Sequence, residues 1–437
     1  MYDLAIIGLG PAGLEAAQIA IKNNLNVIAF EKKELGGTCL NVGCIPTKSI
    51  LYTSQLLKEI QESSNLGINM FSSPSYSWQT ILDRKIEIVN KFNKLLNTTI
   101  SKNLTLIKAK AEININYNNL EIYADDNVYQ AKNILICTGS SPIELPGLPF
   151  DGNFVINSDD LFNMQDLPKK ITIVGSGAIG LEWAKILSDL GVQVKLIEKA
   201  PTLAPLLDIE LQKRIERILK QNKIEYYKND YITSVSNDLV TLNSGCAFDT
   251  DCILIAIGRK PNLPSITISG CMEKYKLKAE KDGSCDIENL FIVGDAQGQS
   301  MLAHSASYQA RSIMNKILFN KPIKNKPIPS VIYITPEIAS VGLREQDIKN
   351  KEEYTIKKIL VSAIAKSWCD NAADGLVKLI IKDNLIVGGH IVSKEASALI
   401  SIINIFIEQK ISINEIEDMI FPHPSFSEII QEVIKNG

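Results

Sequence analysis

One pattern of strand, glycines, helix, strand and acid occurs twice in this chain and limits its fold more than any other feature. The copies read LAIIGLGPAGLEAAQIAIKNNLNVIAFEK at 4–32 and ITIVGSGAIGLEWAKILSDLGVQVKLIEK at 171–199. A constant offset aligns four positions of each copy: Gly8, Gly10, Gly13 and Glu31 with Gly175, Gly177, Gly180 and Glu198. A lone glycine motif is weak, but the whole order repeated predicts two dinucleotide-binding units on one chain.

Each residue type in the unit has a physical reason. Short runs rich in Ile and Val predict buried parallel strands. The first glycine allows a tight turn, the second lets the backbone approach a pyrophosphate, and the third lets the helix pack near the strand. The helix N-terminus offers amides to the phosphates, and the final acid can accept hydrogen bonds from a ribose. Glu198 would repel a 2′-phosphate and so favours NAD over NADP, although the neighbouring Lys199 weakens that preference.

Three shorter segments also look like strands that run into glycine turns: ILICTGSSP at 134–142, ILIAIGRKPN at 253–262 and LFIVGDAQG at 290–298. They support two nucleotide domains, because ligands bind beyond the carboxyl ends of strands in open α/β sheets. Asp295 stands at such an end, where a ligand-binding acid and an ordinary turn acid both fit the pattern.

Composition narrows the classes of protein. The 437 residues are enough for two to four domains of about 100–200 residues each. A net charge of -3 argues against a nucleic-acid surface or a strongly basic membrane face. No run of about 18 uncharged apolar residues occurs, so no membrane span is expected. The chain opens directly on an apolar strand pattern without a signal-peptide pattern, and a cytoplasmic location is therefore expected.

Two cysteines, Cys39 and Cys44, stand five positions apart in GGTCLNVGCIPTKS at 36–49. They could be core residues, metal ligands or a pair that makes and breaks a bond. The Gly-rich, partly polar context argues against a core stripe, and a metal site would need a second pair or histidines at ligand spacing. The remaining cysteines are scattered and are interpreted as ordinary thiols: Cys137, Cys246, Cys252, Cys271, Cys285 and Cys369. No metal site is predicted.

The redox interpretation sets a geometric condition. Residues five apart on a regular helix have Cα atoms about 8–9 Å apart, whereas a disulfide needs less than about 7 Å. Cys39 and Cys44 can therefore bond only if the helix is irregular or begins between them, and Gly43 and Pro46 favour such a start. The ammonium of Lys48 would stabilise a nearby thiolate, although an exposed lysine on a helix face fits equally well.

At this cysteine motif the sequence closely resembles the flavin-dependent pyridine nucleotide–disulfide oxidoreductases. Its Ile-Pro-Thr-Lys ending is most similar to the dihydrolipoamide dehydrogenase branch of that family. The resemblance covers essentially the whole chain and includes both dinucleotide units. It extends through TGSSP, GRKPN, VGDAQG, MLAHSA, TPEIASVGL, DGLVKLI and HPSFSE, which fall in the family's order.

The resemblance implies an α/β fold with two Rossmann-like dinucleotide-binding domains and a C-terminal α/β dimerisation domain. An FAD-binding domain would comprise 1–142 and 259–328, an NAD-binding domain 143–258, and the dimerisation domain of a homodimer 329–437. Besides the repeated glycines and acids, further positions would bind the cofactors: Thr38, Lys48, Ala111, Thr138, Gly139, Gly258, Asp295 and Ala303.

The resemblance also implies catalytic roles. Cys39 would be the interchange thiol, Cys44 would donate charge to the flavin, and Lys48 would pair with Glu182 beside it. Glu182 also fits plain helix surface, because the matching position of the first copy is Glu15.

The C-terminal segment FPHPSFSE would supply the acid–base group. There His423 and Glu428 would form a pair that reaches across the dimer interface to the partner's cysteines. The other two histidines, His304 and His390, are interpreted as structural.

The implied activity is oxidation of dihydrolipoamide to lipoamide with reduction of NAD. The substrate would be carried on a lipoyl domain of a 2-oxo acid dehydrogenase or glycine cleavage complex. Two alternatives stay open: an NAD(P)H-dependent reductase of another disulfide such as glutathione, and an idle flavoprotein scaffold. Phe421, Ser425 and Ala398 depart from the family's usual residues and bear on the docking surface and on the tuning of His423.

Overall fold

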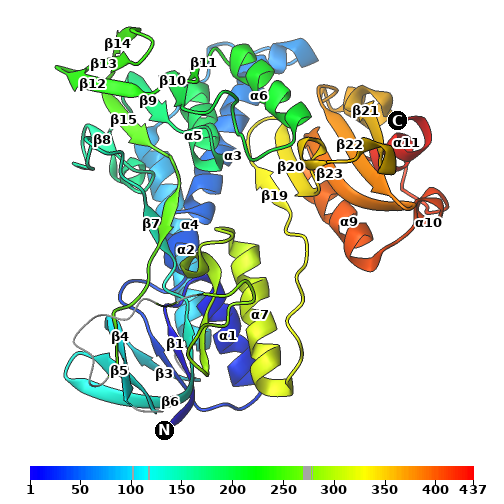
Figure 1. Cartoon of the computed structure of the whole chain (residues 1–437). Helices are drawn as coiled ribbons and strands as arrows, with labels where there is room; N and C mark the ends of the chain where they lie inside the picture. Colours follow the sequence, from blue (N-terminus) through cyan, green and yellow to red (C-terminus); the bar gives the residue numbers. More distant parts are fainter. Residues whose placement is uncertain (101–102, 117–118, 269–276, 278) are drawn as a thin grey trace.

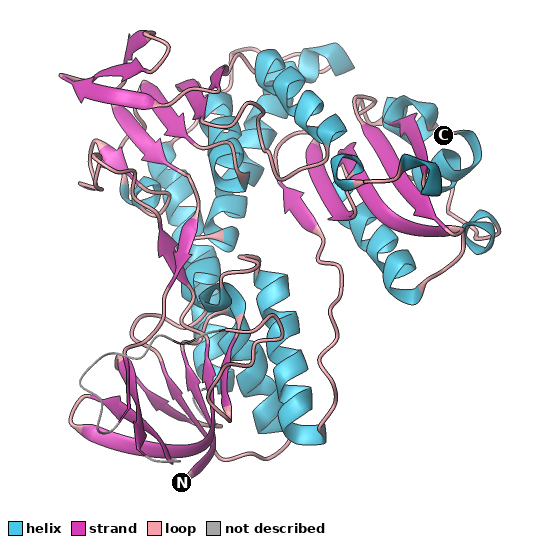
Figure 2. Cartoon of the chain, in the orientation of Figure 1, coloured by secondary structure: helices cyan, strands magenta, loops and turns pink. Residues whose placement is uncertain are grey.

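The computed structural model describes residues 1–100, 103–116, 119–268, 277 and 279–437 and has an α/β fold. Figures 1 and 2 show three sheet-containing parts. The part with the N-terminus lies at the bottom of the view, a second lies above it, and the C-terminal part lies beside the second. No helix within these described ranges is long and apolar enough to cross a bilayer.

The first sheet contains the N-terminal glycine unit. Its parallel strands run in the spatial order β3 (Thr105–Ile107), β2 (Val27–Phe30), β1 (Tyr2–Ile7), β6 (Asn127–Ile136) and β18 (Leu290–Ile292). The long β6 also continues into an antiparallel layer with β5 (Asn119–Ala124) and β4 (Ala111–Asn116), to which β17 (Ile266–Ile268) adds in parallel. Helices α1 (Pro11–Lys22) and α7 (Ala303–Phe319) pack together beside this sheet.

The second sheet repeats this order around the second glycine unit. Its parallel strands are β11 (Glu225–Lys228), β10 (Gln193–Glu198), β9 (Lys170–Val174), β15 (Cys252–Ile255) and β8 (Val155–Ile156). A small antiparallel sheet follows with β12 (Ile232–Ser236), β13 (Leu239–Leu242) and β14 (Ala247–Asp249). Helices α5 (Ala178–Asp189) and α6 (Ile209–Gln221) belong to this part. The predicted glycine-unit strands and helices are thus present in both copies.

Two kinds of connection join these parts. The chain crosses between the two sheets on β7 (Ser140–Pro142) and again on β16 (Arg259–Pro261), and the two crossings pair as an antiparallel ribbon. Helices α3 (Cys44–Glu62) and α4 (Trp78–Ile100) run from the first part up to the second (Figure 1). The short α2 (Gly37–Asn41) precedes α3. The helix that begins at Cys44 therefore extends from the first sheet-containing part toward the second.

The C-terminal part is an antiparallel sheet with helices against it. Its strands run β19 (Ser330–Ile332), β20 (Glu337–Gly342), β23 (Leu385–Ser393), β22 (Leu376–Lys382) and β21 (Thr355–Leu360). The helices are α8 (Ala365–Cys369), α9 (Ala396–Gln409), α10 (Ile413–Glu417) and α11 (Glu428–Asn436). A stretch without helix or strand at 320–329 leads from α7 to β19, as its prolines and lysines suggest.

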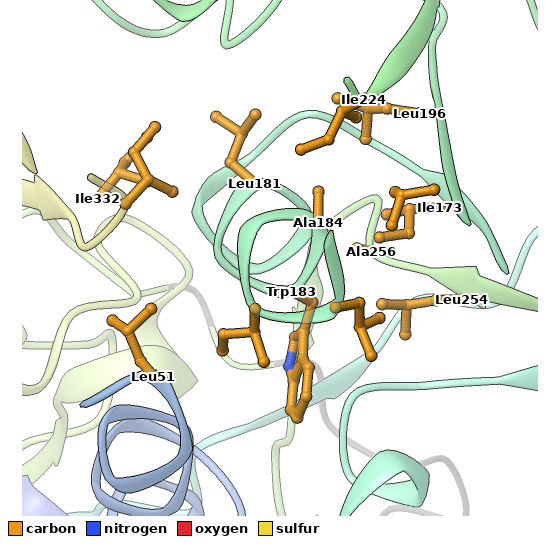
Figure 3. Close-up of a cluster of buried hydrophobic side chains, with 14 of the residues drawn as sticks. Leu51, Ile173, Leu181, Trp183, Ala184, Leu196, Ile224, Leu254, Ala256 and Ile332 are labelled. Atoms are coloured by element: carbon orange, nitrogen blue, oxygen red, sulfur yellow. The ribbon is translucent and has the colours of Figure 1, made fainter. Parts of the chain in front are cut away.

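One hydrophobic core joins parts of the chain that are far apart in sequence. Helix α5 is buried on nearly all sides, including its charged residues Glu182, Lys185 and Asp189. Figure 3 shows Trp183 and Leu181 on α5, with Leu51 of α3 and Ile332 of β19 nearby. The second sheet, α3 and the C-terminal sheet are therefore packed together around α5.

Candidate functional site

The first glycine of each unit occupies a turn that only glycine adopts easily. Gly8 has φ +95° and Gly175 has φ +103°, both in the left-handed region. A Cβ there would also lie 2.5 Å from a carbonyl oxygen, that of Cys137 or of Ala256. The tight turn predicted from the sequence is therefore present twice, with the same cause.

The space around the second and third glycines of each unit differs, as their expected roles require. A Cβ on Gly13 or Gly180 would overlap the carbonyl oxygen of the first glycine of its unit, so the third glycine is needed for the helix to pack close. A Cβ on Gly177 would meet no atom within 4 Å, and one on Gly10 only the Cα of Gly37 at 3.9 Å. The backbone at the second glycine is thus open to a ligand, and both turns fit the pyrophosphate of a dinucleotide.

The acid that ends the second strand of each unit is held in the same way in both copies. Glu31 Oε2 accepts from the backbone N–H of Leu9 at 2.8 Å, and Oε1 accepts from Lys33 at 2.9 Å. Glu198 Oε2 accepts from the backbone N–H of Ser176 at 2.9 Å and from its hydroxyl at 2.6 Å, and Oε1 accepts from the backbone N–H of Ala200 at 2.8 Å. A carboxylate has about four acceptor positions, so each acid retains capacity for a ribose hydroxyl beside the glycine turn.

A polar cluster lies where the chain crosses between the two nucleotide parts. Thr138 and Gly139 follow β6, and Gly139 has φ +69°. Asp295 Oδ2 accepts from the hydroxyl of Ser140 at 2.6 Å, and Arg259 Nε donates to the same hydroxyl at 2.7 Å. Asp295 is therefore bound to the crossing and is more than an isolated turn acid, while Ser140 and Arg259 are polar members that the motif analysis did not single out.

The other predicted cofactor positions are dispersed along the same parts. Thr38 is an exposed residue of α2, and Ala111 is the buried first residue of β4. Gly258, with φ +119°, precedes β16, and Ala303 begins α7. The structure thus places each of them at an element end or turn of a nucleotide part.

The two cysteines meet because a helix begins between them. Helix α2 ends at Asn41, and α3 begins at Cys44. A Cβ on Gly43 would lie 2.8 Å from the carbonyl oxygen of Thr38 and 3.3 Å from the Cα of Cys39, so only glycine lets the chain fold back this tightly. The predicted irregularity is confirmed. Both thiols are free in the structure, and each acts on the pKa of the other.

The pair is electrostatically asymmetric. The hydrogen bond from Cys39 lowers the pKa of the Cys44 thiol to about 7, with help from the charge of Lys48, while burial and Glu182 oppose this effect. The same hydrogen bond, together with burial, raises the pKa of the Cys39 thiol. When the reduced pair loses one proton, the negative charge therefore lies on Cys44, and Cys39 keeps its proton.

Lys48 and Glu182 form the ion pair expected between them. Lys48 Nζ lies 2.5 Å from Glu182 Oε2, and the side chains are 33% and 7% exposed. Glu182 is thus buried, and the interpretation as plain helix surface is wrong. Its other oxygen accepts from the backbone N–H of Tyr333 at 3.0 Å, and the Tyr333 ring centroid lies 4.5 Å from Lys48 Nζ.

Tyr333 is a site residue that the sequence analysis missed. It stands two residues before the quoted segment TPEIASVGL, which begins at Thr335, and the structure packs it, partly buried, against the core around α5. Neither Lys48 nor Glu182 is close to it in sequence, which is why no motif marks it.

His423 and Glu428 form a pair on the C-terminal part. His423 Nδ1 lies 2.8 Å from Glu428 Oε1, and the imidazole side chain is 72% exposed. The hydrogen bond from the backbone N–H of Ser425 lowers the pKa of the Glu428 carboxyl, and the hydrogen bond from the imidazole of His423 adds a smaller effect in the same direction. The pair precedes and begins α11, on the far side of the C-terminal part from α2 (Figure 1). Within one chain, the structure does not bring it to the cysteines.

The remaining histidines have local partners. His390 is fully buried between the Ser340 hydroxyl at 2.7 Å and the Leu343 carbonyl at 2.9 Å, which agrees with a structural role. His304, near the start of α7, contacts the Pro329 carbonyl at 2.7 Å.

The other described cysteines are free, and Cys271 lies outside the described residues. In the described part of the chain, no group of three or more His, Cys, Asp or Glu side chains is placed to hold a metal ion.

Two family descriptions match nearly the whole chain. Residues 2–310 match pyridine nucleotide-disulphide oxidoreductase, and residues 328–434 match the dimerisation domain of the same proteins. The chain belongs to the pyridine nucleotide–disulphide oxidoreductase family. The resemblance stated from the cysteine motif is thereby confirmed, and so is the fold of two nucleotide parts with a C-terminal dimerisation domain.

Individual members of the family are similar over their whole length. The chain is 32% identical to the dihydrolipoyl dehydrogenase of Mycoplasma pneumoniae, over 100% of this chain and 98% of that protein. It is 34% identical to the dihydrolipoyl dehydrogenase of Buchnera aphidicola subsp. Schizaphis graminum, over 98% and 94%. The crystal structure of LpdA from Mycobacterium tuberculosis has the same fold, with a TM-score of 0.89, 23% identity and 99% of each chain covered.

Proposed function

We propose that this oxidoreductase oxidises dihydrolipoamide to lipoamide and reduces NAD, through a reversible Cys39–Cys44 disulfide and bound FAD. The observation that carries the proposal is the asymmetric thiol pair at the start of α3, beside the partly buried Lys48–Glu182 ion pair. The names of the similar Mycoplasma and Buchnera proteins support lipoamide as the substrate.

The cofactor positions follow from the two glycine units. We assign FAD to residues 1–142 with 259–328, NAD to 143–258, and dimerisation to 329–437. Gly10 and Glu31 would hold the FAD pyrophosphate and ribose, and Gly177 and Glu198 those of NAD. When bound, FAD would accept an electron pair from a dithiol and pass it on as a hydride to a nicotinamide.

NAD is the expected nucleotide because of the charge at the second ribose site. Glu198 lies beside the Gly177 turn, where it suits a ribose diol and repels a 2′-phosphate. Lys199, the neighbouring cation, has its Nζ 5.8 Å from the centroid of the Tyr231 ring. Lys199 thus has an aromatic contact of its own, whereas Glu198 is the acid bound to the glycine turn.

The cysteines perform the dithiol chemistry. In the oxidised enzyme a substrate thiolate attacks Cys39, its sulfur forms a mixed disulfide, and the bond to Cys44 breaks with the electron pair left on Cys44. The second substrate thiolate then displaces Cys39, which releases lipoamide and leaves the dithiol. The low pKa of Cys44 makes it the better leaving group in the first step, and the raised pKa of Cys39 lets it take a proton in the second.

A base is needed for each substrate thiol, and His423 is the candidate. Glu428 holds its Nδ1, which orients the imidazole and leaves Nε2 to take and return the proton. Because His423 is exposed and apart from the cysteines of its own chain, we assign it to the cysteines of the partner in a homodimer. The match of residues 328–434 to a dimerisation domain supports that assembly.

The partner and the location are parts of the same proposal. Dihydrolipoamide would be presented on a lipoyl domain of a 2-oxo acid dehydrogenase or glycine cleavage complex, in the cytoplasm. A reductase of another disulfide such as glutathione would share the thiol pair, and Glu198 disfavours the NADPH that such an enzyme would use.

The decisive experiment compares substrates and cysteine variants on purified protein. We expect a yellow protein that NADH bleaches, that turns over dihydrolipoamide with NAD, and that reduces oxidised glutathione poorly. Cys44→Ser should abolish lipoamide turnover and the long-wavelength thiolate–flavin absorbance, whereas Cys369→Ser, a control at an exposed cysteine outside the pair, should leave both intact. Retained turnover in the Cys44 variant would overturn the mechanism, and faster reduction of glutathione disulfide would overturn the substrate. A protein without flavin would overturn both.

A further inference from the structure

Three segments that are distant in sequence meet at the ammonium of Lys48. Lys48 belongs to α3, Glu182 to α5, and Tyr333 to the chain just after β19. Glu182 Oε2 accepts a hydrogen bond from the Lys48 ammonium at 2.5 Å, and Glu182 Oε1 accepts one from the backbone N–H of Tyr333 at 3.0 Å. The aromatic ring of the same tyrosine lies 4.5 Å from Lys48 Nζ. Tyr333 thus contacts both members of the ion pair, with different groups.

The position of Tyr333 is determined by its neighbours. Ile332 and Ile334 are 6% and 1% exposed and belong to the core around α5, with Leu51 of α3 (Figure 3). The side chain of Tyr333 between them is partly buried against the same core, and its ring lies at the edge where it meets Lys48. Two residues on, Thr335 Oγ1 accepts from Gln55 Nε2 at 2.9 Å, which fixes the segment along α3.

A ring face at this distance attracts an ammonium group. The quadrupole of an aromatic ring stabilises a cation within about 6 Å of its centroid, and more strongly where water is partly excluded. Lys48 is only one-third exposed, so the ring occupies a direction in which the ammonium would otherwise find water. The flexible lysine is then limited to the space between the carboxylate and the ring.

We propose that Tyr333 is a positioning residue whose ring holds the ammonium of Lys48 beside Glu182 and the Cys44 sulfur. The residue comes from the C-terminal part of the chain, so this part would act on the redox centre of its own chain as well as on dimerisation. The role deepens the proposed function and rests on the thiol pair being the redox centre.

The charged and titratable groups around the centre make the effect asymmetric. Cys44 is faced by Cys39 from α2, Lys48 from α3 and Glu182 from α5. Tyr333 is faced by Glu337 from β20, by Glu182 and Cys44, and by the ammonium of Lys48. Lys48 favours the Cys44 thiolate and Glu182 disfavours it.

Loss of the ring frees the cation but not the carboxylate. The backbone N–H of Tyr333 remains in any variant and keeps Glu182 in place. The thiolate would lose part of its stabilising charge while the opposing charge stays. The pKa of Cys44 should therefore rise.

The test measures the pKa of Cys44 directly. In a Cys39→Ser background, whose hydroxyl still donates a hydrogen bond, the rate of Cys44 alkylation by iodoacetamide is followed against pH by peptide mass spectrometry. Tyr333→Leu should raise the pKa of Cys44 by about half a unit or more. Tyr333→Phe keeps the ring and should leave the pKa unchanged. Tyr333→Met, which lacks an aromatic face but fills space, provides a second measurement if the leucine variant does not fold.

The outcomes distinguish an effect of the aromatic ring on the pKa of Cys44 from an effect of altered packing. Equal pKa values in the parent, leucine and methionine proteins would overturn the proposal, as would an equal shift in the phenylalanine variant. Alkylation needs no flavin, so the assay gives its answer even if the protein retains none. Flavin content and NADH bleaching, measured in parallel, report on the proposed function alone.

Discussion

Adding one methyl group at Gly177 should damage nucleotide binding without damaging the fold. Gly177 precedes α5 with φ −73° and ψ −176°, a backbone conformation that alanine adopts without strain. Its Cβ would meet no atom within 4 Å. Alanine is a poorer residue than glycine at a helix N-cap, so the free energy of unfolding should fall by no more than about 1 kcal/mol.

The same methyl group would stand where the backbone must approach the pyrophosphate. A phosphate pushed away loses a charge-assisted hydrogen bond to a backbone N–H, which is worth about 1.5–3 kcal/mol. NAD should therefore bind about 10–100-fold more weakly to Gly177→Ala. FAD should stay, because the first unit is untouched.

Two matched variants complete the test. Gly10→Ala makes the same change in the first unit, where the new Cβ meets only Gly37 Cα at 3.9 Å, and it should lose FAD. Gly180→Ala instead places its Cβ against the carbonyl oxygen of Gly175, so the helix must shift and stability should fall by about 1–3 kcal/mol or more.

The assays are flavin absorbance of the purified protein, KM for NAD and denaturant unfolding. A Gly177→Ala protein with an unchanged KM would refute the reasoning about the open glycine. A Gly177→Ala protein that loses its flavin while Gly10→Ala keeps it would reverse the assignment of the two cofactors.

Three further predictions concern the C-terminal part. His423→Gln should lower lipoamide turnover about 100-fold or more, because thiol protons lose their acceptor, while bleaching by NADH stays; unchanged turnover in a steady-state assay would exclude the base. Lys378 is 1% exposed and donates to the fully buried Asp208 at 2.8 Å, so Lys378→Met should lower the free energy of unfolding by about 3–5 kcal/mol. Urea unfolding should find the double variant with Asp208→Leu less destabilised, and an equal loss in both would contradict the buried-charge argument. Burial lowers the pKa of His390, so the unfolded chain binds a proton below about pH 6.5 that the folded chain refuses. Stability should therefore be fully present above that pH and decline as the pH falls through the folded pKa. His390→Gln should remove that part of the decline in unfolding measured against pH, and an unaltered decline would assign it elsewhere.

What the sequence determined by itself is local. The turns at Gly8 and Gly175 could be predicted because positive φ is a property of single residues and their nearest neighbours. The start of a helix between Cys39 and Cys44 could be predicted for the same reason, from Gly43. The repeated unit also determined the parallel sheets, because periodicity of apolar residues is readable along a few consecutive positions.

Only the tertiary structure decided which residues far apart in sequence interact electrostatically. The pKa of Cys44 depends on Lys48 and Glu182, and Tyr333 contacts both members of that ion pair; packing around α5 brings the three residues together. The separation of His423 from the cysteines of its own chain is likewise visible only in the assembled fold. Electrostatic interactions act through space over a few ångströms, whereas a sequence records separation along the chain, so these contacts leave no local pattern to read.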